Sequence, residues 1–213
     1  MLLGKLQALL HRFYALEVVY EVDDFLTTDA AFARALDAGG REVDEKLLIA
    51  EADGQAEVAL YLEQELLERL DQRDPFACLD ADNLADFWAV LEGVSHFTYY
   101  AWNAEREKPV TLFELELQAE VDKFVATGML LRQQHGREPG GLHGWLFEQP
   151  TLDNDLAGAE RERYRRANRY AGKYCRRLAP ALLRGAEEET VQRELRRFYR
   201  LSQTSKLAHI DAH

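Results

Sequence analysis

The hydrophobic pattern of the chain changes once, near residue 62. Before this point, apolar and polar side chains alternate with a period of two, which is typical of half-buried β-strands. Beyond it, apolar residues recur every three to four positions, as in helices with one buried face. Because a small sheet must cover its apolar face with helices, we expect an α+β fold. In this fold a small three-stranded antiparallel sheet in the N-terminal third packs against a mostly helical remainder.

The three expected strands lie within the first 62 residues. The first is predicted over residues 16–22, where apolar side chains occupy alternate positions. The other two flank the dipeptide Asp53-Gly54, which favours a tight two-residue turn. Counting outward from this turn places Ile49 opposite Val58. In this register one face of the hairpin is directed to the core, and its residues are Ile49, Val58, Leu60 and Leu62.

Capping signals and periodicity predict the helices. A stripe of apolar residues over 3–13 indicates an N-terminal helix, and Asp29 is placed to cap a short one. Thr111 and Glu114 have the spacing of a capping box. Longer helices are predicted over about 63–72, 82–104, 112–133, 157–178 and 187–201. The segment 134–155 is rich in glycine and proline and is expected to be a long loop.

Composition limits the class of protein. The 38 acidic residues outnumber the 26 basic ones, and the net charge of −12 argues against a surface that coats nucleic acid or anionic lipid. The apolar stretch over 124–131 is too short to span a membrane, so no membrane association is expected. Cys78 and Cys175 are too few for a disulfide framework, which fits the cytoplasm. The common nucleotide-binding, zinc-protease and serine-hydrolase motifs are missing from the sequence.

Charge is distributed unevenly along the chain. Residues 1–156 carry 12 basic and 31 acidic side chains, whereas residues 157–213 carry 14 and 7. We expect a single α+β domain over 1–213. A subdivision would place an acidic body at 1–134, a loop at 135–155 and a basic helical part at 156–213.

One helix of the basic part carries a stripe of cations spaced four residues apart, which are Arg161, Arg165, Arg169 and Lys173. Guanidinium groups match phosphate and carboxylate in two-pronged geometry, so this stripe is a candidate surface for an anion or an acidic partner. Charge runs are also typical of solvated helix faces, and the stripe is equally placed to neutralise the acidic part of its own chain.

A second candidate site combines carboxylates with an imidazole. Glu92 and His96 share one helix face, and Glu116 and Glu120 share a face of the following helix. If the two helices are antiparallel, the pairs meet, and Glu with His is a ligand set for a divalent transition metal. The same pattern also fits a general acid or base at His96, or ordinary polar pairs on helix surfaces.

Two functions follow from these features. The leading interpretation is a non-catalytic cytoplasmic binding module without a cofactor, in which the basic C-terminal helices contact a protein partner or a second copy in preference to nucleic acid. The alternative is a small metal-dependent or acid–base hydrolytic enzyme with one divalent ion at Glu92, His96, Glu116 and Glu120.

Overall fold

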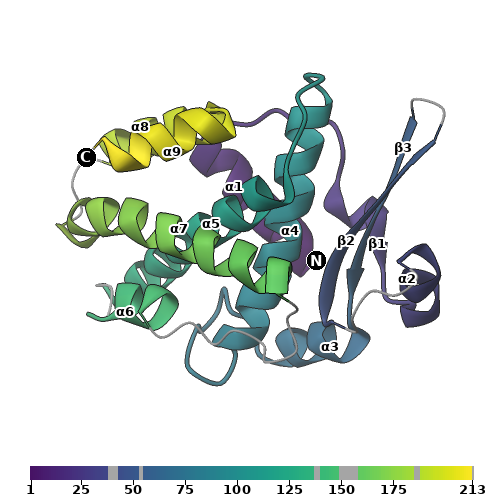
Figure 1. The fold of residues 1–213 in the computed structure, drawn as a ribbon. Coiled ribbons are helices and arrows are strands. Elements are labelled where there is room, and N and C mark those ends of the chain that lie inside the picture. The colour runs from purple at the N-terminus through teal and green to yellow at the C-terminus, as the bar shows by residue number, and fades with distance from the viewer. Residues whose placement is uncertain (38–42, 53–54, 137–139, 149–157, 185–187, 213) are drawn as a thin grey trace.

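The computed structural model describes residues 1–37, 43–52, 55–136, 140–148, 158–184 and 188–212. Helices make up most of these residues, and a small sheet lies near the N-terminus, as the sequence predicts (Figure 1). The helices of the described residues are α1 (Leu2–Tyr14), α2 (Ala30–Leu36), α3 (Gln64–Gln72), α4 (Leu84–Ala104), α5 (Leu112–His135), α6 (Leu142–Phe147), α7 (Gly158–Arg184), α8 (Glu188–Arg200) and α9 (Gln203–Asp211), with a short 3-10 helix η1 (Val22–Phe25).

The sheet is mixed, so the prediction of a purely antiparallel sheet is wrong. Its strands are β1 (Leu26–Thr27), β2 (Glu45–Ala52) and β3 (Gln55–Leu62), and β3 lies in the middle. β2 and β3 are antiparallel, whereas β1 runs parallel to β3. The chain reverses direction between β1 and β2 and again at the hairpin, so β3 returns to the direction of β1.

The first strand lies later in the chain than the alternation predicted. Residues 16–22 form no strand, because the backbone there finds other partners. The buried side chain of Gln7 donates from Nε2 to the Tyr20 carbonyl at 2.8 Å and accepts from the Val22 N–H at 2.9 Å. Val19 is 84% exposed and its N–H donates to Glu105. A side chain of α1 thus supplies hydrogen bonds that a neighbouring strand would otherwise provide.

The hairpin register is confirmed, because Ile49 lies opposite Val58. The Asp53-Gly54 turn lies outside the described residues. Leu60 and Leu62 are fully buried, and Val58 packs against the core as expected. Ile49 is 38% exposed, which corrects its assignment to the core. It lies in the half of β2 that leads toward the turn of the hairpin.

Both predicted caps are confirmed. Asp29 accepts hydrogen bonds from the N–H groups of Ala31 and Phe32 at the start of α2. Thr111 and Glu114 exchange hydrogen bonds of 3.1 Å at the start of α5. The prediction of a continuous loop over 134–155 is wrong, because α6 forms within it and buries Leu142 and Leu146. α7 continues past its predicted end at residue 178, and α9 follows α8 without having been predicted.

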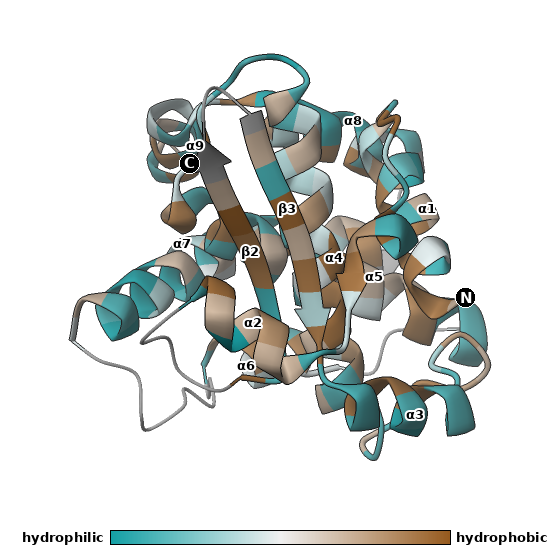
Figure 2. Ribbon diagram, turned by 90° about the vertical axis from the view of Figure 1, so that its right-hand side faces the viewer, coloured by the Kyte–Doolittle hydropathy of each residue, from teal (hydrophilic) through white to brown (hydrophobic). Residues whose placement is uncertain are grey.

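The sheet has helices on both faces. Figure 1 shows α4 and the other long helices on one side of the sheet and α2 on the other, and Figure 2 shows β2 and β3 crossing in front of the helical body. A continuous cluster of buried apolar residues joins α1, β3, α4, α5, α7 and α8. Within the part of the chain that the structure describes, no helix is both long and apolar enough to cross a membrane.

Candidate metal centre

Helix α4 supplies two of the candidate ligands. It is buried around most of its circumference, since it packs against the sheet on one side and against α5 on another. Glu92 and His96 stand one turn apart on this helix, as the spacing predicts, and their side chains are only 17% and 8% exposed. Ser95, the neighbour of His96, donates to Asp122 at 2.6 Å and so belongs to a different face.

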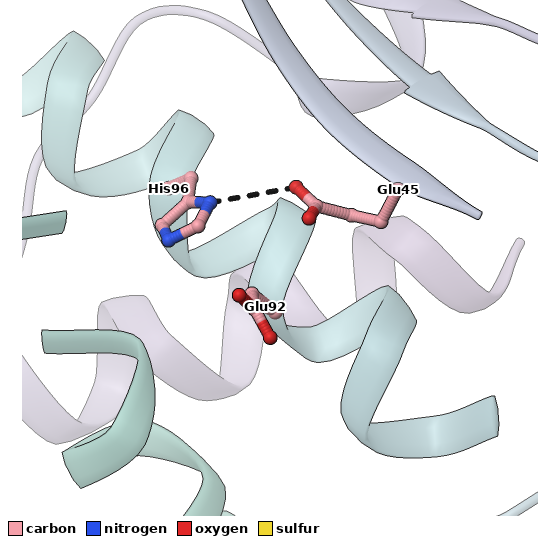
Figure 3. Close-up of side chains that lie close together, drawn as sticks. All are labelled: Glu45, Glu92 and His96. Atoms are coloured by element: carbon pink, nitrogen blue, oxygen red, sulfur yellow. Dashed lines mark ion pairs between the residues drawn. The ribbon is translucent and has the colours of Figure 1, made fainter. Parts of the chain in front are cut away.

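The third candidate ligand comes from the sheet. Glu45 at the start of β2 reaches across to α4, and its Oε1 lies 3.4 Å from His96 Nδ1 (Figure 3). Gly93 permits this approach, because a Cβ there would lie only 2.8 Å from Glu45 Cγ. Glu45, Glu92 and His96 each offer a ligand atom, and these atoms all lie within 4.8 Å of one another. Two ligands of a tetrahedral zinc ion stand roughly 3.4 Å apart, which is the separation of Glu45 and His96.

The other ring nitrogen of His96 faces α5. His96 Nε2 lies 3.9 Å from Glu116 Oε2 and, within the described residues, has no hydrogen-bond partner although it is buried. Glu116 in turn lies 3.6 Å from Arg163 Nε on α7. Metal-binding histidines commonly point one nitrogen at the metal and the other at a carboxylate that fixes the ring. Glu116 stands where that carboxylate is required.

Lys123 links the centre to Glu120. Its ammonium donates to Glu92 Oε2 and to Glu120 Oε1, the latter at 3.0 Å. Asn168 on α7 donates to Glu120 Oε2 at 2.8 Å. Because a carboxylate has two oxygens, Glu92 can accept from Lys123 through Oε2 and still offer Oε1 to a cation. Glu120, in contrast, accepts a hydrogen bond on each oxygen, from Lys123 on Oε1 and from Asn168 on Oε2.

Burial and charge act in opposite directions on these groups. Burial alone would lower the pKa of His96, but its contact with Glu45 and the charges of Glu116 and Glu92 raise this pKa to about 9. Burial raises the pKa of Glu116 to about 8. Despite its burial, Lys123 has a pKa held above its ordinary value by Glu120 and Glu92. The carboxylates thus create a buried region that favours positive charge.

The structure brings together part of the predicted set. Glu92 and His96 lie on one face of α4, whereas Glu116 and Glu120 lie beside the centre. His96 and Glu116 are buried, and Glu92 and Glu120 are half-buried, so none of the four is on an exposed helix face. The ligand that the sequence pattern missed is Glu45. Glu45 lies opposite Leu62 in the hairpin. The sequence could have indicated it, because it is a carboxylate on the face of the predicted strand that was directed to the core.

The predicted cationic stripe lies along α7. Arg165, Arg169 and Lys173 are exposed, and Arg161 is half-buried. Lys173 Nζ lies 3.0 Å from Asp211 Oδ1 on α9, so this member of the stripe pairs with a carboxylate of its own chain. Lys173 and Arg169 also line a cavity between α6, α7 and α9. Binding of a partner to the stripe stays a prediction.

The described geometry can hold a divalent ion through two carboxylates and one imidazole, with Glu116 as the group that orients the imidazole. Ligands of this kind suit zinc, manganese and related transition metals. Comparisons of the chain with models of protein families, with curated proteins and with solved structures gave no match.

Proposed function

We propose that the protein binds one divalent transition-metal ion through Glu45, Glu92 and His96. The observation that carries this proposal is the convergence of three ligand atoms from β2 and α4 within 4.8 Å. The placement of Glu116 behind the imidazole supports it independently, because an unpartnered ring nitrogen faces a carboxylate there. An ion at this position would connect the sheet to the helical body.

A role in binding or in stabilising the fold is favoured over hydrolysis. The side chains of Glu45, Glu92 and His96 are 13%, 17% and 8% exposed, so a substrate would find little access to an ion between them. Three protein ligands leave room for water on the ion, which is the arrangement of catalytic sites, but catalysis also needs an entry path. We therefore propose a non-catalytic binding protein, as in the leading interpretation from the sequence, that holds the divalent ion of the alternative interpretation.

The test is a measurement of metal content and thermal stability. We expect the purified protein, incubated with Zn²⁺ or Mn²⁺ and then dialysed, to retain about one ion per chain, because three protein ligands favour one bound ion. Its melting temperature should rise in the presence of excess metal, because a ligand that binds only the native state stabilises it.

The variants distinguish the proposed roles. Glu45→Gln and His96→Gln should abolish retention of the ion, whereas Glu116→Gln should weaken affinity about 10–100-fold, as loss of an orienting partner does. Glu57→Gln, an exposed carboxylate on β3, is the control and should bind like the parent. Retention of metal by Glu45→Gln at the parental level would remove Glu45 from the site. A parent protein that retains neither ion and shows no thermal shift would end the proposal.

A contact surface on the C-terminal helices and a cytoplasmic location remain proposals beside the metal centre. The first rests on the exposed cations of α7, and the second on the two cysteines, which are both free thiols.

A further inference from the structure

A cavity of about 540 Å³ lies between α6, α7 and α9, apart from the metal centre. Its volume is within the range of small-molecule sites, which is about 300–1,000 Å³. Figure 1 shows α6 and α9 on two sides of α7, and both helices contact it. Its lining includes His143, Phe147, Arg169, Gly172, Lys173 and Ile210.

The wall formed by α7 is cationic, and its charged residues are Arg169, Lys173, Arg176 and Arg177. Two carboxylates also line the cavity, Glu148 after α6 and Asp211 at the end of α9. The cavity therefore carries an excess of two positive charges in a chain whose net charge is −12. Such a local excess attracts anions against the field of the whole molecule.

The ion pairs at the cavity leave this charge available. Lys173 and Asp211 are 3.0 Å apart with side chains 55% and 49% exposed, and Arg176 with Glu148 is more exposed still. Exposed pairs of this kind are weak and exchange readily for another anion. Arg169 lies 5.5 Å from the centre of the Tyr170 ring and makes no ion pair with any residue that the structure describes. Arg177 donates to the His209 carbonyl and, among the described residues, also makes no ion pair. A bound anion would therefore meet two cations without a carboxylate partner and two in weak pairs.

The rest of the lining is mostly apolar, apart from Asn168 of α7 and the ring nitrogens of His143, and it is closely packed. Phe147 and Ile210 line the cavity, and the ring of His143 lies 5.1 Å from that of Phe147. His143 Nε2 lies 2.9 Å from the Gly172 carbonyl, which ties α6 to α7. Gly172 packs tightly on Phe147, since a Cβ there would lie 3.0 Å from Phe147 Cβ. The apolar wall is thus held against α7 by direct packing.

We propose that this cavity binds a small organic phosphate with an apolar or aromatic body. Arg169 and Lys173 would contact the phosphate, because guanidinium groups bind its oxygens in pairs and ammonium groups add point charge. Phe147, Ile210 and the ring of His143 would contact the body of the ligand. The pairing of charge on one wall with apolar surface on the other favours this class over inorganic phosphate or an uncharged aromatic compound.

Phenyl phosphate is the minimal probe, because it combines a phosphate with one aromatic ring. We expect titration followed by nuclear magnetic resonance or calorimetry to show binding to the full chain at least tenfold tighter than inorganic phosphate or phenol. Arg169→Gln and Lys173→Gln should each weaken it tenfold or more. Arg165→Gln removes the same charge one turn away, outside the cavity lining, and should bind like the parent.

Three results would overturn the proposal. The first is no binding of phenyl phosphate at millimolar concentration. The second is equal affinity for phenyl phosphate and inorganic phosphate, which would mean that the apolar wall plays no part. The third is equal weakening by Arg165→Gln and Arg169→Gln, which would assign binding to the general charge of α7. None of these results bears on the metal centre, since Arg169 and Lys173 are not among its ligands.

Discussion

Lys206 is a charged residue whose pKa is changed by burial. This lysine of α9 is fully buried, and its ammonium donates to Gln118 Oε1 at 2.8 Å and lies 4.4 Å from the centre of the Tyr99 ring. Burial lowers its pKa to about 7, although the charges of Glu114 and Asp122 act in the opposite direction. The folded protein therefore holds this proton less tightly than the unfolded chain, in which the pKa is near 10.5.

The first prediction concerns the pH dependence of stability at Lys206. Between pH 7 and about 10 the unfolded chain binds one more proton at this residue, so its contribution to stability should rise with pH, by about 1 kcal/mol per unit. Lys206→Met removes this dependence while keeping most of the volume. The variant should gain stability relative to the parent as the pH falls from 10 to 7, measured by urea unfolding. A constant difference between the two proteins over this range would show that the ammonium is not held at a lowered pKa.

Two glycines inside helices, Gly93 and Gly128, differ in how closely a neighbouring element approaches them. At Gly93 in α4, a Cβ would meet Glu45 Cγ at 2.8 Å and Leu60 Cδ1 at 2.9 Å, so the sheet approaches the helix closely there. At Gly128 in α5, the nearest atom is Leu142 Cδ2 at 3.6 Å, which is an ordinary contact. The helix preference for alanine is the same at both positions.

The second prediction is that alanine at these glycines changes stability in opposite directions. Gly128→Ala should stabilise the protein by up to about 1 kcal/mol through helix propensity. Gly93→Ala should destabilise it, because overpacking typically costs about 1–3 kcal/mol and outweighs the same gain. Thermal unfolding of both variants measures the difference. Equal stabilisation by the two substitutions would mean that α4 and the sheet are not in close contact at Gly93.

Charge separation is a property of the whole molecule. The acidic first 156 residues fold with a C-terminal part that carries excess positive charge, and α7 lies against α5. Arg163 of α7 reaches the buried Glu116, and Lys173 pairs with Asp211. Beyond such contacts, we expect the exposed cations of α7 to reduce the repulsion among the acidic side chains of the body.

The third prediction follows from this charge distribution. Replacing Arg161, Arg165 and Arg169 together by Gln should lower the melting temperature most at low salt, because repulsion among carboxylates is least screened there. The loss should shrink at 1 M salt, which serves as the control condition. A variant that melts with the parent at low salt would show that these three arginines do not stabilise their own chain. An unchanged melting temperature at low salt is the result expected if these arginines serve only to bind a partner.

Much of the local structure followed from short-range patterns in the sequence. The change of period near residue 62 separates a strand-forming part from a helical part, and the capping signals at Asp29 and Thr111 mark helix starts that the structure shows. The hairpin register followed from a short turn signal and alternating residues. These features depend on interactions between residues close together in the chain, so a sequence pattern is enough to predict them.

Tertiary structure decided where distant segments meet. Residues 16–22 have the alternation of a strand, but Gln7 of α1 takes up their backbone hydrogen bonds. Glu92 and His96 were recognisable as a pair, whereas their third partner, Glu45, is nearly fifty residues away and meets them only because Gly93 lets β2 approach α4. Helical periodicity determines which residues lie on the same face of a helix, but it does not determine which other helix or strand packs against that face. That choice depends on the packing of the whole chain, because burial is favourable wherever apolar surfaces fit together.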